Sequence, residues 1–162
     1  MARARRRTET DADHDFELWS LLHQCSDAIA RARENELRQV DISMVKAAVL
    51  FFVKNMDGPA TPAKISRYLF REPHTISGLL DRMESQGLVS RVHDLHRKNL
   101  VRIEMTEKGE EFYRKSREKR KIISKIMAVL TEGERDDLRL YLEKLRNKAL
   151  REIGVKTPLP FP

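Results

Sequence analysis

The chain has 162 residues, of which 40% are hydrophobic and 35% charged, and its formal net charge is +7 at pH 7. This composition predicts a soluble domain with a core of its own and excludes a disordered chain. No apolar run approaches the ~20 residues that a membrane span needs, and no apolar segment follows the charged N-terminus, so neither a membrane helix nor a secretory signal is expected.

The first 39 residues divide into a basic arm and a long helix. Residues 1–10 carry four arginines between positions 3 and 7 without periodicity, which predicts a disordered arm. Over 11–39, apolar residues such as Phe16 and Trp19 recur every three or four positions, as on one face of a helix. Cys25 lies on this stripe, so we expect a buried structural thiol. As the only cysteine, it excludes an internal disulfide framework and indicates the cytoplasm.

Residues 44–56 are apolar on most sides, which predicts a helix buried as a central scaffold. Asp57, Gly58 and Pro59 end it in a turn. Thr61 then suits an N-cap with Pro62 at the first helical position, and a short helix follows. A three-residue turn over 70–72 leads to the next helix, so the order is helix, turn, helix.

The helix predicted over 73–87 has two unlike faces. Its inward face carries large apolar residues at i, i+3, i+4 and i+7, namely Ile76, Leu79, Leu80 and Met83. Its outward face carries mostly small hydrogen-bonding groups, with Thr75 and Arg82 at the flanks: His74, Ser77, Gly78, Asp81 and Ser85. Small side chains let a partner approach closely, which suits the entry of a helix N-terminus into a DNA major groove.

Two strand-like runs follow, over 88–93 and 100–105, joined by a polar turn over 94–99. A hairpin directly after such a helix is a wing. Residues 61–109 carry a net charge of +3, from nine Lys or Arg and six Asp or Glu. That excess suits contact with phosphates, and ordinary solvated charge explains it equally well.

Residues 107–150 predict two further helices. Thr106 is the expected N-cap of a continuous helix over 107–130, and Thr131 with Glu134 forms a capping box for the last helix. Residues 151–162 are a proline-rich tail. Residues 114–125 hold seven Lys or Arg and one Glu, whereas residues 9–17 hold five acids and no Lys or Arg. We hypothesise that these two stretches face each other, within the chain or across a dimer; contact of the basic stretch with DNA is the alternative.

These elements predict a single unit over 11–150 that is mainly α with a small β-hairpin wing. It is a winged helix-turn-helix over 41–106 between long dimerisation helices at 11–39 and 107–150. Apolar stripes on the first and last helices favour a symmetric homodimer, which would place two recognition helices about one DNA turn (~34 Å) apart.

The phrases TISGLLDRMESQGLVSR and VRIEMTEKG, in this order of elements, resemble the MarR family of bacterial and archaeal transcriptional regulators. The resemblance covers about residues 14–150. It implies a homodimeric repressor of a pseudo-palindromic operator in double-stranded DNA, with base contacts from the outward face of the second helix and groove contacts from the wing tip. Many members release DNA when a small aromatic anion binds between the dimer helices and the DNA-binding lobe.

The DNA-binding candidates are polar and basic residues of the two short helices and the wing, together with Pro73 and Gly78: Thr61, Lys64, Pro73, His74, Thr75, Ser77, Gly78, Arg82, Arg91, Arg97, Lys98 and Asn99. The sequence departs from the family pattern in three places. Gly78 stands where Arg is frequent, the wing has Arg97-Lys98-Asn99 in place of Asp-x-Arg, and no glycine lies near Phe70.

Four residues are candidates to line an effector pocket, although core packing is the favoured interpretation of each, with contact across a dimer as the alternative for Trp19: Trp19, His23, Phe52 and Tyr68. Two alternatives remain beside a ligand-released repressor. One is a redox sensor that acts through Cys25, and the other is a winged-helix module that binds protein instead of DNA. The basic wing and the small outward face favour DNA.

Enzyme signals are poor. The five histidines form no metal-spacing motif with Cys25, and phosphate contact explains His93 and His96 on the wing more simply than a metal does. No phosphate-binding glycine loop and no nucleophile motif occur. We therefore expect no catalytic residues, no metal and no cofactor.

Overall fold

The computed structural model describes residues 9–93, 100–118 and 120–155, which form seven helices and one antiparallel hairpin. The elements are α1 (Glu9–Arg38), α2 (Met44–Asn55), α3 (Pro62–Leu69), α4 (Pro73–Ser85), β1 (Val89–His93), β2 (Val101–Met105), α5 (Glu107–Glu118), α6 (Lys121–Met127) and α7 (Glu132–Glu152). The predicted mainly α fold with a hairpin wing is confirmed. None of the helices in these residues is long and apolar enough to span a membrane.

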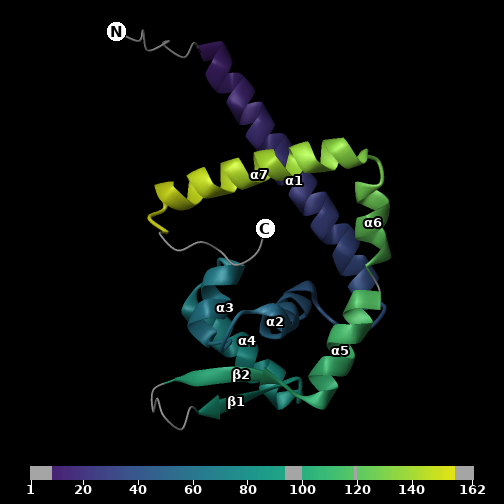
Figure 1. Cartoon of the computed structure of the whole chain (residues 1–162), viewed down its shortest axis with the longest axis vertical. Coiled ribbons are helices and arrows are strands. Elements are labelled where there is room, and N and C mark those ends of the chain that lie inside the picture. The colour runs from purple at the N-terminus through teal and green to yellow at the C-terminus, as the bar shows by residue number, and fades with distance from the viewer. Residues whose placement is uncertain (1–8, 94–99, 119, 156–162) are drawn as a thin grey trace.

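The molecule consists of a compact lobe and two long arms. Figure 1 shows α2, α3, α4 and the hairpin gathered in the lobe, while α1 and α7 extend beyond it and α5 and α6 run along one side. α1 begins two residues before the predicted start, and α7 continues two residues into the predicted tail. The two arms are thus α1 and α7, which extend beyond the lobe as separate helices (Figure 1).

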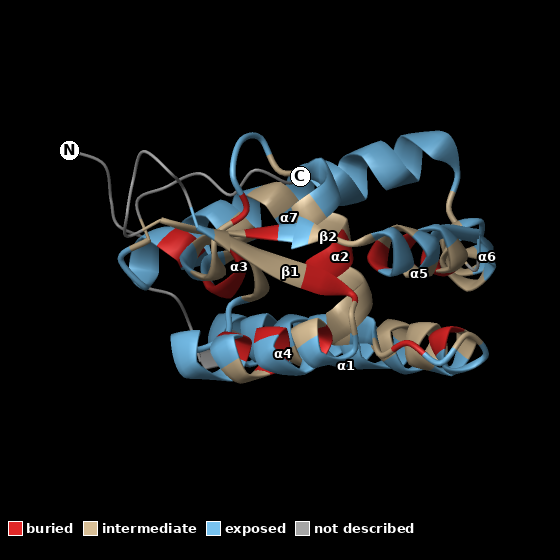
Figure 2. Ribbon diagram, turned by 90° about the horizontal axis from the view of Figure 1, so that it is seen from below, coloured by how far each residue is buried: buried red, intermediate tan, exposed pale blue. Residues whose placement is uncertain are grey.

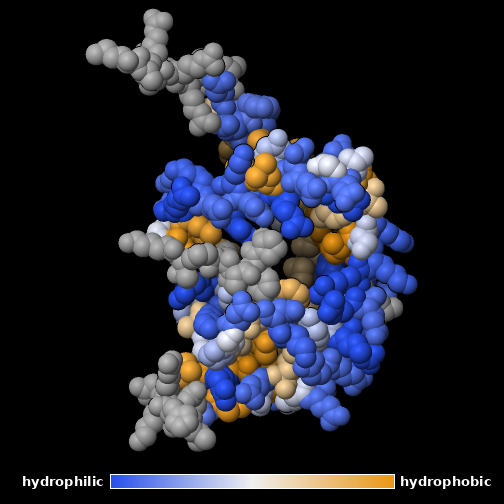
Figure 3. Space-filling model, viewed as in Figure 1, coloured by the Kyte–Doolittle hydropathy of each residue, from blue (hydrophilic) through white to orange (hydrophobic). Residues whose placement is uncertain are grey.

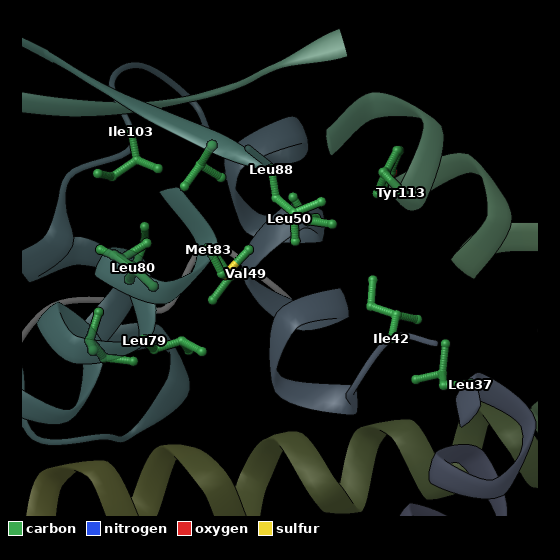
Figure 4. Close-up of a cluster of buried hydrophobic side chains, with 13 residues drawn as sticks. Leu37, Ile42, Val49, Leu50, Leu79, Leu80, Met83, Leu88, Ile103 and Tyr113 are labelled. Carbon is green, nitrogen blue, oxygen red and sulfur yellow. The ribbon is translucent and has the colours of Figure 1, made fainter. Parts of the chain in front are cut away.

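The hydrophobic core lies in the lobe. Its buried residues come from the end of α1, from α2 to α5, from the hairpin and from the connections before α2 and β1 (Figure 4): Leu37, Ile42, Val49, Leu50, Ile65, Ile76, Leu79, Leu80, Met83, Leu88, Val89, Ile103 and Tyr113. Burying one such leucine or isoleucine side chain stabilises the fold by roughly 1.5–3 kcal/mol. Figure 2 shows the contrast with α7, which is exposed along most of its length. Within one chain, the buried apolar residues are thus concentrated in the lobe.

The hairpin is held between the end of α4 and the start of α5. β1 and β2 pair with Val89 opposite Met105. The hydroxyl of Thr106 donates to the Gly87 carbonyl at 2.6 Å and accepts from the Gly109 N–H at 3.0 Å. A Cβ at Gly109 would lie 2.0 Å from the Leu88 carbonyl oxygen, so only glycine fits there. The Thr-x-x-Gly phrase is thus a close-packed joint that sets the direction of the wing.

The prediction of one continuous helix over 107–130 is wrong, because α5 ends at Glu118 and α6 begins at Lys121. The carboxylate of Glu36, in α1, accepts the Ile122 N–H at 3.0 Å and the Arg33 guanidinium at 2.6 Å. Arg33 also donates to the Ser116 carbonyl at 2.7 Å. Donors at a helix N-terminus need an acceptor, and Glu36 supplies it from another helix. This tertiary cap allows the helix to break where the sequence shows no helix-breaking residue.

The same contacts place α6 against the C-terminal part of α1. The acidic stretch over 9–17 lies at the opposite end of α1, which projects away from the rest of the chain (Figure 1). The hypothesis that the acidic and basic stretches face each other within one chain is therefore wrong.

Candidate nucleic-acid interface

The turn between α3 and α4 is built without glycine. Phe70 adopts the left-handed conformation there, with φ of 50° and ψ of 43°. That conformation costs a non-glycine residue about 1–2 kcal/mol. The buried Ser66 offsets the strain, because its hydroxyl donates to the Arg71 carbonyl at 2.6 Å and its carbonyl accepts the Arg71 N–H at 3.1 Å. The turn thus keeps the helix-turn-helix geometry through a serine clamp.

Thr61 and Pro73 start the two helices as predicted. The Thr61 hydroxyl accepts the Lys64 N–H at 3.3 Å, which caps α3, and Pro73 is the first residue of α4. The ammonium of Lys64 donates to the Pro59 carbonyl at 3.0 Å at the surface, so this cation also fastens the turn before α3. α3 and α4 pack against each other at the centre of the candidate interface.

α4 separates a buried face from an open one. Ile76, Leu80 and Met83 are fully buried, and Leu79 is nearly so. His74, Thr75, Ser77 and Arg82 are exposed on the remaining surface. A Cβ built on Gly78 would meet nothing within 4 Å, so the fold does not require glycine at that position. The N-terminal half of α4 therefore presents a shallow polar surface that another molecule can approach closely.

Arg91, predicted to contact DNA, forms ion pairs with two carboxylates of α4 within the lobe. Its guanidinium lies 2.6 Å from Asp81 and 2.6 Å from Glu84, and its backbone N–H donates to Glu84 at 2.8 Å. These hydrogen bonds from Arg91 to the Glu84 carboxylate hold the pKa of Glu84 below its ordinary value. The side chain of Arg91 is only 24% exposed. Arg91 thus ties the first wing strand to α4.

The acidic partners of this tie were missed in the sequence, as was the clamp by Ser66. Asp81 and Glu84 lie three positions apart on α4, so they share a helix face, and this spacing was the available signal. No sequence pattern marked Ser66. The predicted wing-tip residues Arg97, Lys98 and Asn99 lie outside the residues that the structure describes.

The four effector candidates form two separate pairs. Phe52 and Tyr68 stack with ring centroids 4.9 Å apart and planes 8° apart, and burial raises the pKa of Tyr68. The ring centroids of Trp19 and His23 lie 5.7 Å apart on α1, and both residues are exposed. The expectation of a core position is therefore wrong for both in the single chain, and the alternative of a dimer contact stays a prediction for Trp19. A groove of about 800 Å³ between α2, β2 and α5 is lined by none of these four residues.

The expectation of a buried Cys25 is also wrong for the single chain, where the thiol is exposed. Cys25 shares the stripe of Trp19 and Leu22, and both of these are exposed. The predicted apolar stripe is present on α1, but its residues stay exposed within one chain.

Known proteins share this architecture. A sequence model described as MarR family matches residues 40–98. The organohalide-sensing RdhR-CbdbA1625 transcriptional regulator in its ligand-free form is 30% identical, with a TM-score of 0.80 over 99% of this chain and 98% of that chain. The chain belongs to the MarR family. The resemblance inferred from the sequence is confirmed, and the protein is a transcriptional regulator.

Two further structures extend the comparison of this MarR-family protein. The same RdhR-CbdbA1625 regulator in its 2,4-dichlorophenol-bound form is 30% identical, with a TM-score of 0.80 over 100% of this chain and 98% of that chain. A mutant MarR from E. coli complexed with operator DNA is 21% identical, with a TM-score of 0.74 over 82% and 96% of the two chains, and shares the fold. No curated protein shows a significant match to the sequence. The family is one of transcriptional regulators and not of enzymes.

Proposed function

We propose that this protein is a sequence-specific DNA-binding repressor that acts as a homodimer on a pseudo-palindromic operator. The observation that carries the proposal is the outward face of α4, which is polar, small and open at Gly78. Long charged side chains would hold DNA away from the backbone of a helix, whereas the short side chains of this surface allow α4 to enter a major groove. The cytoplasmic location expected from the sequence belongs to the same proposal, because the operator lies on chromosomal DNA.

Within this proposal, the candidate residues have distinct roles. His74, Thr75, Ser77 and Gly78 meet base edges from the first turns of α4. Thr61, Lys64, Pro73 and Arg82 meet phosphates, and the wing tip with Arg97, Lys98 and Asn99 flanks the minor groove. Arg91 acts differently from the sequence-based prediction, because its two ion pairs make it the residue that orients the wing.

The homodimer is supported by the apolar side chains that one chain leaves open on α1 and α7. Those exposed by more than a third are Phe16, Leu18, Trp19, Leu21, Leu22, Leu138, Leu140, Tyr141, Leu142 and Leu145. Figure 3 shows apolar side chains at the surface over α7. A monomer rarely exposes so many large apolar side chains on two helices, and a symmetric partner with the same stripes is a matching cover.

Fluorescence anisotropy with the duplex upstream of the protein's own reading frame tests DNA binding. We expect the affinity to fall steeply with salt, with a log–log slope of about −0.9 per phosphate contact. Replacing both His74 and Ser77 by glutamate should weaken binding by roughly 100-fold or more, because carboxylates would face phosphates and base acceptors. Ser85→Glu, exposed at the far end of α4, is the matched control. Unchanged affinity in the double variant would overturn the proposal.

Gly78→Ala gives a second, finer test. Alanine stabilises an exposed helix by about 0.5–1 kcal/mol over glycine, and the position has room for a methyl group. We therefore expect a higher unfolding midpoint together with a lower DNA affinity. A variant that gains stability and keeps full affinity would show that close approach at Gly78 is not used.

We further infer that a small aromatic ligand releases the DNA. The regulator that is 30% identical was crystallised with 2,4-dichlorophenol. In this chain the stacked, half-buried rings of Phe52 and Tyr68 offer an aromatic surface where α2 meets α3. Titration of 2,4-dichlorophenol into the protein–DNA complex should lower the anisotropy, and Tyr68→Ala should raise the concentration needed. A complex that persists at millimolar ligand would contradict release by this ligand.

A further inference from the structure

We propose that the acidic end of α1 docks on the basic surface of α5 and α6 in a second copy of the chain. The acidic end is residues 11–17, and the basic surface is Arg117, Lys121 and Lys125. This inference rests on the proposed homodimer and deepens it, because it names the contact that sets the orientation of the two copies and makes their assembly depend on salt.

The two surfaces are opposite in charge and open to a partner. Residues 11–17 contain four acids and no Lys or Arg, and all of these side chains are exposed. Arg117, Lys121 and Lys125 are exposed as well. Within the described part of the chain, Lys121 and Lys125 form no ion pair, and they lie four positions apart on one face of α6. Both surfaces thus carry exposed charge of opposite sign, and at the acidic end His14 lies 3.9 Å from Glu17.

Geometry prevents the two surfaces from meeting inside one chain. The basic surface is attached to α1 at Arg33 and Glu36, through the bonds to Ser116 and Ile122. Arg33 lies sixteen positions after Glu17, which corresponds to about 24 Å along a helix. An ion pair closes at about 4 Å or less. Figure 1 shows the N-terminal part of α1 extending away from α6, and Figure 3 shows that its surface is hydrophilic.

In a symmetric dimer, the acidic end of one copy can reach the basic surface of the other copy. When two α1 helices pack through the exposed stripe of Phe16, Trp19 and Leu22, they can run parallel or antiparallel. The parallel arrangement brings four acids of one copy next to four acids of the other, which is repulsive. The antiparallel arrangement with its two-fold axis at Cys25, on the same exposed stripe, brings the acidic end to the C-terminal part of the partner's α1, where the partner's basic surface is attached. Because an isologous interface repeats every contact, the favourable pairing occurs twice.

Two charge-reversed variants of the full chain test this contact. The acid-reversed variant carries Asp13→Lys and Glu17→Lys, and the base-reversed variant carries Lys121→Glu and Lys125→Glu. All four positions are exposed, so the fold should survive, and circular dichroism checks this. The control, Asp57→Lys with Glu72→Lys, reverses two exposed acids on the lobe. Sedimentation equilibrium gives the dimer dissociation constant in about 50 and 500 mM NaCl, where screening differs strongly.

We expect the dissociation constant of the wild-type dimer to rise at least tenfold between the lower and the higher salt. At the lower salt, each reversed variant should have a dissociation constant at least tenfold above that of the wild type, and the control should match the wild type. Mixing the two reversed variants should restore wild-type affinity, because both contacts of the mixed dimer then join opposite charges. If neither salt nor either charge reversal changes the dimer dissociation constant, this inference is overturned and the proposed function is unaffected. The inference is also overturned if both variants dimerise weakly and their mixture does not recover the wild-type dissociation constant.

Two other results have separate meanings. A wild-type chain that stays single at every concentration would overturn the homodimer in the proposed function as well. A base-reversed variant that dimerises normally but binds DNA less tightly would assign the basic surface to phosphates and overturn the docking proposed here.

Discussion

The DNA-binding lobe and the two terminal helices solve the problem of burial in different ways. The lobe covers its own apolar residues, so that Leu50, Ile65 and Leu80 are fully buried within one chain. α7, by contrast, buries Leu150 alone, and the N-terminal half of α1 leaves Trp19 56% exposed. The difference teaches that one copy suffices to bury the core of the lobe, whereas in the proposed homodimer a partner covers the exposed apolar residues of the two arms. Four predictions test this division.

The largest effect is expected at the joint between wing and α5. Gly109→Val would force a side chain against the Leu88 carbonyl, because even a Cβ would lie 2.0 Å from that oxygen. We expect a loss of about 4 kcal/mol or more in the free energy of unfolding, measured by urea titration. The control is Gly133→Ala in α7, where nothing lies within 4 Å and the change should be neutral or stabilising. Similar losses in both variants would refute the close-packed joint.

Two leucine truncations compare the halves directly. Leu80→Ala removes a fully buried side chain of the lobe and should cost about 3 kcal/mol at any protein concentration. Leu142 is 39% exposed in one chain, so Leu142→Ala should act through the partner. Its loss of stability should therefore appear at protein concentrations where the wild type is dimeric and should vanish on dilution. The division fails if the Leu142 variant loses the same stability at every concentration.

The tie between the wing and α4 predicts a pH effect. The folded-state pKa of Glu84 lies below its ordinary value of 4.5, mainly because of hydrogen bonds from Arg91. A lowered pKa stabilises the fold above the ordinary pKa, and the contribution is lost as the pH falls through the lowered value. In Arg91→Gln we therefore expect weaker DNA binding and a shallower fall of the urea midpoint between about pH 5 and pH 3.

Arg82→Gln is the matched control for this test, because Arg82 is exposed on the same helix. It should weaken DNA binding while keeping the acid-side slope of the wild type. An identical slope in the Arg91 variant would show that its ion pairs do not contribute to stability.

The smallest effect is expected at the turn between the two helices of the DNA-binding motif. Phe70→Gly should relieve the left-handed strain and raise stability by up to about 1 kcal/mol. Phe70 is 57% exposed, so little packing is lost. Phe70→Ala also removes the ring but keeps the strain, and it should not gain stability. Thermal unfolding of the two variants distinguishes the backbone effect from the side-chain effect, and equal midpoints would contradict the strain.

The sequence predicted what local pattern determines and missed what depends on tertiary contacts. The i, i+3, i+4, i+7 pattern of Ile76, Leu79, Leu80 and Met83 was enough to place α4 and its buried face. The break between α5 and α6 could not be predicted, because its cap, Glu36, comes from α1, 86 positions earlier than Ile122. Apolar periodicity found the stripe of α1, but it cannot distinguish a stripe covered by the same chain from one left for a partner.

The mass of the full chain in solution tests the central claim most directly. One chain has a mass of 19.0 kDa. If the lobe is complete in one copy and the arms require two, sedimentation equilibrium at micromolar concentration in low salt will give twice that mass, with two chains on each DNA duplex. A single-chain mass throughout, with one chain bound to each duplex, would contradict the account.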